Sequence, residues 1–272
     1  MALFRMTRPP GGLRAIVTAG FAAVALCAFA DPAAAQQKPD KYGHYNQNAT
    51  EFTGVCGDNA CGPIALLNSL VFLQNTYASL DGKLVGKDPV ETAKTLAKLM
   101  KCDTKCGTNT FNFFKGKKQY LKDLVGNAID SVMYNGPTFD NLSKELTDGE
   151  DVEMFITFDK ADGKPDGGHY VTLYDITKDT LSFVDPGGLS GKDGGKIDGA
   201  VEEKVKYTFD EKTKRIVLTD YEGTPTGDVA KASFAFAESP HKSVPEPQAW
   251  ALMIVGFGAL GAAARQRRSL AA

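Results

Sequence analysis

The sequence predicts an α+β domain in which helices come first and an antiparallel sheet follows. Helix-type spacing of apolar residues is confined to residues 61–146, whereas alternating, strand-type segments begin at residue 152. Helices and strands that are segregated in this way are typical of α+β domains and not of alternating β-α units. The chain of 272 residues is 43% hydrophobic, which is enough to bury a core. This composition excludes a disordered or collagen-like chain.

Four helices are expected in the first half of the chain. The first, at 61–75, has Pro63 in its first turn and is apolar on nearly every face, so it should be buried. The second, at 88–100, begins at Asp88, which is a good N-cap residue, and carries one apolar stripe. Shorter segments at 117–124 and 139–146 complete the set.

The strands that follow form the expected sheet, against which the buried helix would pack. Their bounds are 152–158, 169–176, 181–184, 205–209, 215–220 and 232–237. A hairpin centred on Thr177 would place Asp185 directly opposite His169, within about 5 Å between Cβ atoms. A tight two-residue turn would place Asp185 across from Thr172 instead, and a bulge would then be needed to bring it to His169.

The first 35 residues have the features of a secretory signal. Arg5, Arg8 and Arg14 precede an apolar run, and three alanines at 33–35 offer a small-residue cleavage site before Gln36. A short membrane anchor is the alternative, although the apolar run is too short to span a bilayer comfortably. The mature protein is expected to start near Gln36, which makes the cell envelope or the extracellular space its destination.

The C-terminal segment 244–268 has three parts in a fixed order. A Val-Pro-Glu-Pro sequence precedes an uncharged, Gly- and Ala-rich stretch at 248–264, which ends in a cluster of arginines at 265–268. This order resembles the PEP-CTERM sorting tag of Gram-negative bacteria that make exopolysaccharide. The resemblance implies processing by an exosortase, transient residence of the segment in the inner membrane, and an association with an extracellular polysaccharide matrix. A plain C-terminal anchor is the alternative.

Charge is unevenly distributed along the chain. The whole sequence has 31 basic and 33 acidic residues, but six arginines lie in the two terminal segments. The part between them is therefore distinctly acidic, which argues against a nucleic-acid partner. We expect contact with a membrane only through the terminal segments.

Four cysteines remain once Cys27 leaves with the signal, and an exported protein can form disulfides. Cys102 and Cys106 flank only three residues, so we predict that they pair and that Cys61 stays free. The pairing state of Cys56 is left open: it is either free or in reversible disulfide exchange with Cys61. An all-structural set of cysteines is one alternative. A four-thiolate zinc site is another, but the spacings are wider than usual, and no metal is expected.

Cys61 is singled out by its position at the start of the buried helix. Unpaired N–H groups and the positive end of the helix dipole favour a thiolate there, as a nucleophile requires. A base is also needed, and among the histidines His44 and His241 lie in polar or terminal stretches. His169 lies at the mouth of a strand, and Asp185 ends the next one. These three residues match the roles of nucleophile, base and orienting carboxylate.

The arrangement resembles the papain-like cysteine peptidases, most closely the bacterial branch with leader-peptide-cleaving domains of bacteriocin exporters. The similarity covers roughly residues 41–190 within a domain expected to span 41–240. It is carried by Cys61-Gly62-Pro63, by residues 148–152, by Gly168-His169-Tyr170-Val171 and by Val184-Asp185-Pro186. The resemblance implies a papain-like fold, with Cys61 as nucleophile, His169 as general base and acid, and Asp185 as the residue that orients it.

One feature of the family is missing. A glutamine about six residues before the cysteine usually helps to stabilise the oxyanion, and Val55 stands at that position. Asn59 and Gln47 are the candidate replacements, together with the N–H group of Cys61. Losing one such donor would raise the barrier by about 3 kcal/mol.

The expected function is therefore that of an exported cysteine hydrolase that cleaves peptide or amide bonds in a peptide or protein substrate. No cofactor motif occurs in the sequence, and none is expected. Two alternatives remain: a non-catalytic matrix- or surface-binding module in which Cys56 and Cys61 form a disulfide, and a transglutaminase-like acyltransferase that uses the same three residues.

Overall fold

The computed structural model describes residues 35–105, 107–187 and 196–241. The helices are α1 (Thr53–Cys56), α2 (Cys61–Thr76), α3 (Pro89–Leu99), α4 (Thr110–Val125) and α5 (Phe139–Asp148), with short 3-10 turns at Pro39–Lys41, Thr50–Phe52 and Ala78–Leu80. The strands are β1 (Ala35–Gln36), β2 (Ile129–Asn135), β3 (Asp151–Asp159), β4 (Pro165–Ile176), β5 (Thr180–Asp185), β6 (Val201–Asp210), β7 (Arg215–Leu218) and β8 (Val229–Pro240).

The sheet closes on itself. Strands β3 to β8 follow one another as antiparallel neighbours, and β8 pairs back with β3, so that six strands form a closed barrel. Strand β2 pairs with β8, and the short β1 with β4, outside this ring. The expected α+β fold of papain type, with helices packed on an antiparallel sheet, is therefore wrong. The six barrel strands lie close to the positions predicted for them. The pairing of β3 with β8, which closes the barrel, was not predicted.

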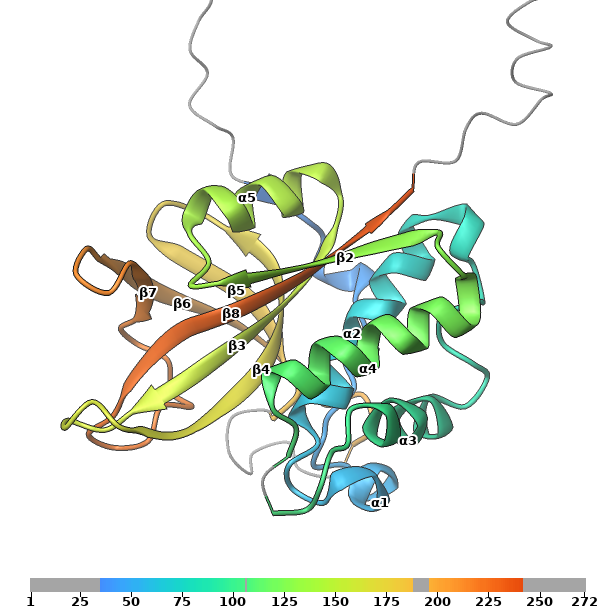
Figure 1. Cartoon of the computed structure of the whole chain (residues 1–272), viewed down its shortest axis with the longest axis horizontal. Coiled ribbons are helices and arrows are strands. Elements are labelled where there is room, and N and C mark those ends of the chain that lie inside the picture. The colour runs from blue at the N-terminus through green and yellow to red at the C-terminus, as the bar shows by residue number, and fades with distance from the viewer. Residues whose placement is uncertain (1–34, 106, 188–195, 242–272) are drawn as a thin grey trace, which may run out of the picture. The chain divides into compact units, whose positions relative to one another are not determined.

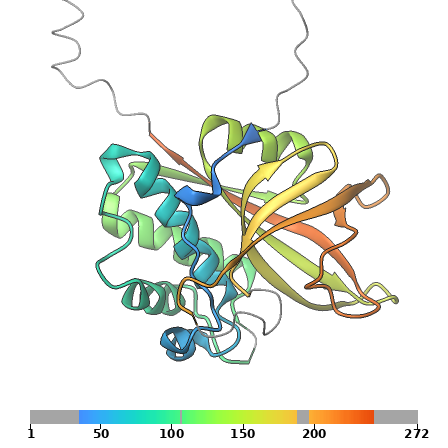
Figure 2. The same ribbon diagram turned by 180° about the vertical axis from the view of Figure 1, so that it is seen from behind.

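Two cores result from this closure. One fills the barrel, where Val152, Met154 and Ile156 of β3 meet Val171 and Leu173 of β4. The other lies between the outer wall of the barrel and the helices, and its members include nearly all of α2. Helices α2, α3 and α4 gather on one side of the barrel, whereas α5 lies over one of its ends (Figures 1 and 2).

The helix boundaries follow from local capping. The expected N-cap is confirmed at α3, because Asp88 accepts a hydrogen bond from the Val90 amide. Helix α4 contains the expected segment 117–124, and it begins at Thr110 because the Asn109 side chain caps it there. Helix α5 begins with a capping box between Thr138 and Asn141.

Strand β2 was not expected. It lies outside the barrel, and its residues are mostly exposed, with Val132 and Met133 among the exposed apolar side chains. A strand without a buried face has no clear alternation of apolar and polar residues.

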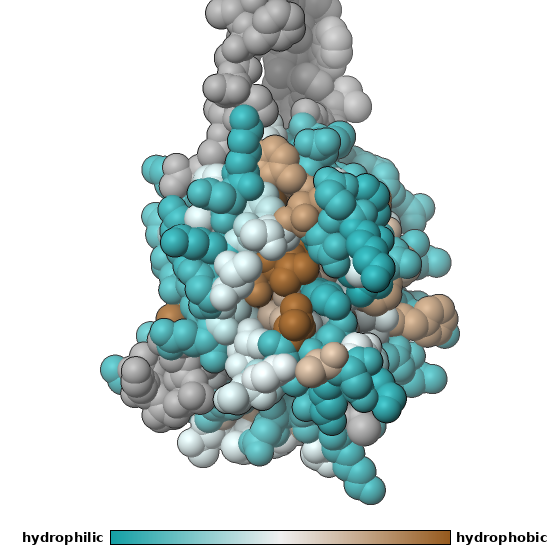
Figure 3. Space-filling model, turned by 90° about the vertical axis from the view of Figure 1, so that its left-hand side faces the viewer, coloured by the Kyte–Doolittle hydropathy of each residue, from teal (hydrophilic) through white to brown (hydrophobic). Residues whose placement is uncertain are grey.

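The face of the molecule on the barrel side is mostly hydrophilic, with a strip of hydrophobic residues down its middle (Figure 3).

A buried ionic cluster joins α4 to the outer wall of the barrel. The fully buried Lys117 forms ion pairs with Glu153 of β3 and Glu238 of β8, and Ser69 of α2 donates to the neighbouring Asp151 at 2.6 Å. Burial raises the pKa of Asp151 to about 7 and lifts that of Glu238 well above its ordinary value. The three carboxylates lie close enough together to hold a metal ion, but Lys117 already supplies the positive charge.

The cysteines pair differently from the prediction. Cys56 at the end of α1 forms a disulfide with Cys102, which follows α3, and Cys61 is free. The predicted Cys102–Cys106 bridge is therefore wrong, and Cys106 lies outside the described residues. The observed bridge ties the segment before α2 to the end of α3. The Cys56–Cys61 bridge, on which the binding-module alternative depended, is replaced by this pairing.

Replacing both Cys56 and Cys102 with alanine is expected to lower the free energy of unfolding by about 2–4 kcal/mol, because the bridge joins residues 46 positions apart and so restricts the unfolded chain. Urea denaturation with and without a reductant measures this. The reductant should destabilise the wild type by a similar amount and leave the double variant unchanged. A wild type that is insensitive to the reductant would contradict the pairing.

Candidate active site

The free thiol lies at the first residue of α2. Cys61 begins a helix of 16 residues, Cys61–Thr76, whose body is almost wholly buried, whereas Cys61 itself is only half-buried. The helix is held against the barrel by Thr172 of β4, whose hydroxyl donates to the Ala65 carbonyl at 2.8 Å. The sulfur is thus fixed at the N-terminal end of a rigid helix, where the helix dipole favours a negative charge.

The hairpin β4–β5 brings His169 and Asp185 together through a bulge. The turn is the tight one, with Ile176 opposite Leu181, so the symmetric hairpin centred on Thr177 is wrong. The register then shifts between Leu173 and Asp175. A shift of one residue reverses which side chains share a face, so Asp185 comes to lie on the same face as His169. The expected need for a bulge is confirmed.

The contact between His169 and Asp185 is short, and other residues hold the Asp185 carboxylate in place. His169 Nε2 lies 2.6 Å from Asp185 Oδ1, with 15% of the His169 side chain and 4% of the Asp185 side chain exposed. The same carboxylate accepts the Tyr221 hydroxyl at 2.7 Å and the Gly187 amide at 2.6 Å. The Cys61 thiol lies beside His169, and each of the two groups shifts the pKa of the other. The three predicted residues therefore form one chain of interacting side chains.

The electrostatics of this chain favour a thiolate paired with an imidazolium. Burial alone would raise the pKa of the Cys61 thiol, but the hydrogen bond and charge of His169 outweigh it and lower the pKa. Burial likewise opposes protonation of His169, yet the charge and hydrogen bond of Asp185 hold the pKa of His169 well above its ordinary value. The pKa of Asp185 is lowered despite its burial, chiefly by the charge of His169. Such a pair is the activated form of a cysteine nucleophile.

Two cavities flank the three residues Cys61, His169 and Asp185. One, of about 350 Å³, is lined by Cys61, Asn59, Phe155 and Tyr170 among others. The other, of about 530 Å³, is lined by His169 and Asp185 with residues of β6 and of the segment after β7. Gly168, the neighbour of His169 in the sequence, lines both cavities and so lies between them. A substrate lying across Gly168 would extend into both.

Two glycines keep this site open. A Cβ atom on Gly168 would lie 2.3 Å from the Phe155 ring, which no side chain tolerates without displacement. A Cβ atom on Gly187 would lie 3.1 Å from both the His169 ring and the Asp185 carboxylate. Any larger residue at Gly187 would press directly on the pair.

The two candidate oxyanion donors lie on opposite sides of the site. The Asn59 amide lines the Cys61 cavity and donates to the Thr104 carbonyl at 2.8 Å. The Gln47 amide lines the His169 cavity and donates to the Asp58 carbonyl at 3.1 Å. Both amide nitrogens are engaged by the protein in this structure, each through one of two N–H groups, so their role in oxyanion binding stays a prediction.

Sequence reasoning missed Tyr221 and Gly187 as partners of Asp185. Gly187 carried a readable signal, because an Asp two residues before a glycine often accepts its amide in a turn. Tyr221 carried none, since it lies 36 residues beyond Asp185 in the sequence. It reaches the carboxylate only because the barrel closes.

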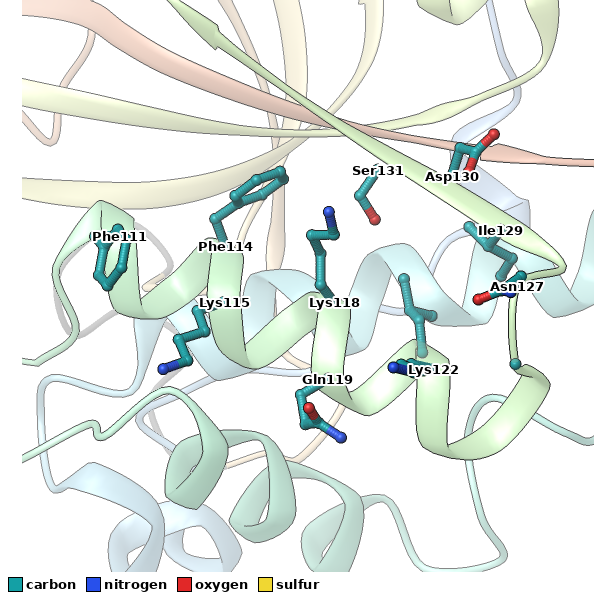
Figure 4. Close-up of a pocket in the computed structure, with 12 residues that line it drawn as sticks. Phe111, Phe114, Lys115, Lys118, Gln119, Lys122, Asn127, Ile129, Asp130 and Ser131 are labelled. Carbon is teal, nitrogen blue, oxygen red and sulfur yellow. The ribbon is translucent and has the colours of Figure 1, made fainter.

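Another cavity, of about 540 Å³, lies between α4 and β2 (Figure 4). Lys118 of α4 and Ser131 of β2 point into the gap between the two elements, whereas Lys115 points away from β2. None of the predicted site residues lines this cavity. Its size matches that of the cavity beside His169, so chemistry and not volume distinguishes the candidate active site.

Residues 243–268 match the PEP-CTERM protein-sorting motif. The sorting tag expected at 244–268 is therefore confirmed, and with it the signal that an exosortase-type processing enzyme recognises on exported proteins. The match does not extend to the part of the chain that contains Cys61, so no family match supports the kinship with papain-like peptidases. Among curated proteins, none matches the chain.

The predicted terminal segments fall largely outside the described part of the chain. This holds for the apolar stretch at 248–264 and for nearly all of the signal at 1–35. Within residues 35–105, 107–187 and 196–241, no helix has the length and apolar character needed to cross a bilayer.

Proposed function

We propose that the protein is an exported cysteine hydrolase that cleaves peptide or amide bonds through Cys61, His169 and Asp185. The observation that carries the proposal is the placing of the free thiol at the start of α2 beside His169, which in turn is hydrogen-bonded to Asp185. The lowered pKa of the thiol and the raised pKa of the imidazole are the pattern that such a nucleophile needs.

In the first half of the reaction, the Cys61 sulfur attacks the carbonyl carbon of the substrate, and the carbonyl electrons move to the oxygen. When this oxyanion collapses, the carbon–nitrogen bond breaks and the leaving amine takes the proton of the His169 imidazolium. An acyl thioester remains on Cys61. Asp185, held by Tyr221 and Gly187, keeps the imidazole ring aligned throughout.

In the second half, water gives a proton to His169 and adds to the thioester carbonyl. Collapse of this second tetrahedral species breaks the carbon–sulfur bond, so the acid is released and the thiolate is restored. An amine in place of water would give acyl transfer.

The test is to incubate the purified protein with casein or a peptide library and to follow new termini by mass spectrometry. Rapid acid quenching should also trap an acyl adduct on the peptide that contains Cys61. The proposal fails if Cys61 carries no adduct and no bond is cut, or if cutting persists after Cys61 has been alkylated.

A further inference from the structure

We infer that the cavity beside His169 is a subsite for a cationic group, so that the preferred substrate carries lysine or arginine directly after the bond that is cut. This inference rests on the proposed function, because the hydrolase reaction fixes which side of the substrate enters this cavity. It names the substrate class, which the reacting residues themselves do not select.

The placement follows from the reaction. His169 must protonate the leaving amine, so the leaving part of the substrate lies on the imidazole side of the sulfur. The cavity on that side is lined by His169 and not by Cys61, whereas the opposite cavity is lined by Cys61 and not by His169. The acyl part of the substrate therefore extends toward the Cys61 cavity, and the leaving part enters the His169 cavity.

The charge of the His169 cavity is one-sided. Besides Asp185, which is engaged by His169, its lining includes Glu203 of β6 and Glu222, which follows β7. No lysine or arginine lines it among the residues the structure describes. The carboxylate of Glu203 is half-buried, and burial with the nearby charge of Asp185 raises its pKa to about 7. The charge of His169 acts on Glu203 in the opposite direction but is outweighed, so a bound cation would add the counter-charge that is missing.

An unpaired acceptor points to the same kind of ligand. Gln47 is only 9% exposed and lines the cavity, and its Oε1 has no hydrogen-bond partner. This oxygen has almost no accessible surface, so an ammonium or guanidinium group in the cavity would reach it after a rotation of the Gln47 side chain. Phe158 and Tyr221, whose rings stack on each other, also line the cavity, and aromatic rings attract cations.

The first test uses thiol reagents of opposite charge and needs no turnover. In a Cys106→Ser background, Cys61 is treated with the cationic trimethylammonium-ethyl methanethiosulfonate and with the anionic sulfonatoethyl analogue. The cationic reagent should react about tenfold faster at low salt. Glu203→Gln should reduce this ratio severalfold. The matched control is Glu202→Gln, because Glu202 is the exposed neighbour on β6 and pairs with His44.

The second test reads the residue that follows each cut in a peptide library. Lysine and arginine should be enriched about tenfold over neutral residues of similar length, and Glu203→Gln should remove most of this enrichment. Equal rates for the two thiol reagents would overturn the subsite. Cleavage without enrichment would overturn the substrate class and leave the hydrolase intact. A charge preference for the reagents without any cleavage would support the subsite and refute the hydrolase.

Discussion

Cys61→Ala and His169→Ala are each expected to reduce hydrolysis by about 10⁴-fold or more, to the level of the assay background. Attack and proton transfer have no substitute elsewhere in the site, since Cys61 is the free cysteine among the described residues and His169 is the base beside it. Asp185→Asn should leave a remnant, because strand β4 still places the His169 ring beside the sulfur while its tautomer and alignment suffer.

The comparison needs proteins that are equally folded. Cys61 is half-buried and small, and the His169 side chain reaches a cavity, so neither change should disturb the core. Thermal unfolding of the variants should match that of the wild type before cleavage is compared. His44→Ala serves as the matched control, because His44 pairs with Glu202 at the surface and should leave cleavage unchanged. Equal cleavage by wild type and Cys61→Ala would refute the assigned chemistry.

Lys117→Met is expected to be the most damaging single change to stability, at about 3–5 kcal/mol. Methionine fills a similar volume but removes the positive charge that balances Glu153 and Glu238 in a site with no exposure. The carboxylates would then have to take up protons or admit water, and either costs stability. Burial lowers the pKa of Lys117, whereas the charges of the two glutamates raise it. The glutamates prevail, and the pKa rises to about 12.

Chemical denaturation of Lys117→Met beside Lys118→Met measures this effect. Lys118 is the next residue of the same helix and is exposed, so its replacement should change the free energy of unfolding by less than about 0.5 kcal/mol. Adding Glu238→Gln to Lys117→Met should recover part of the loss, because one unbalanced carboxylate is removed. Similar stabilities for the two lysine variants would show that the cluster is not held by Lys117.

The elements that could be predicted are those whose sequence carries a local signal. Helix α2 was expected at 61–75 and spans Cys61–Thr76, because a long run of apolar residues after Pro63 has one plausible interpretation. Strand β2 has no buried face, so alternation did not reveal it. The closure of the barrel depends on the pairing of β3 with β8, which lie far apart in the sequence. Alternation indicates which face of a strand is buried, and it is the same for open and closed sheets.

The site residues could be predicted more completely than the fold, because they too carry local sequence signals. Cys61, His169 and Asp185 each stand at the end of a recognisable element, so their chemistry and their proximity could be inferred. The route was left open between a symmetric hairpin and a tight turn with a bulge, because no sequence signal that we identified places the bulge after Leu173. The disulfide prediction failed on distance: Cys106 is near Cys102 in sequence, but the packing of α1 beside α3 brings Cys56 there instead.

The most direct test of the account is the pH dependence of Cys61 alkylation by iodoacetamide in the native, unreduced protein, with Cys106 replaced by serine. Because His169 lowers the pKa of the thiol, the rate should stay high well below pH 8, whereas an ordinary thiol loses about tenfold per pH unit there. His169→Ala should move the profile up to that of an ordinary thiol or higher, because burial alone raises the pKa of the thiol. A wild type that already follows the ordinary profile, unchanged by His169→Ala, would contradict the claim that these residues form an activated nucleophile.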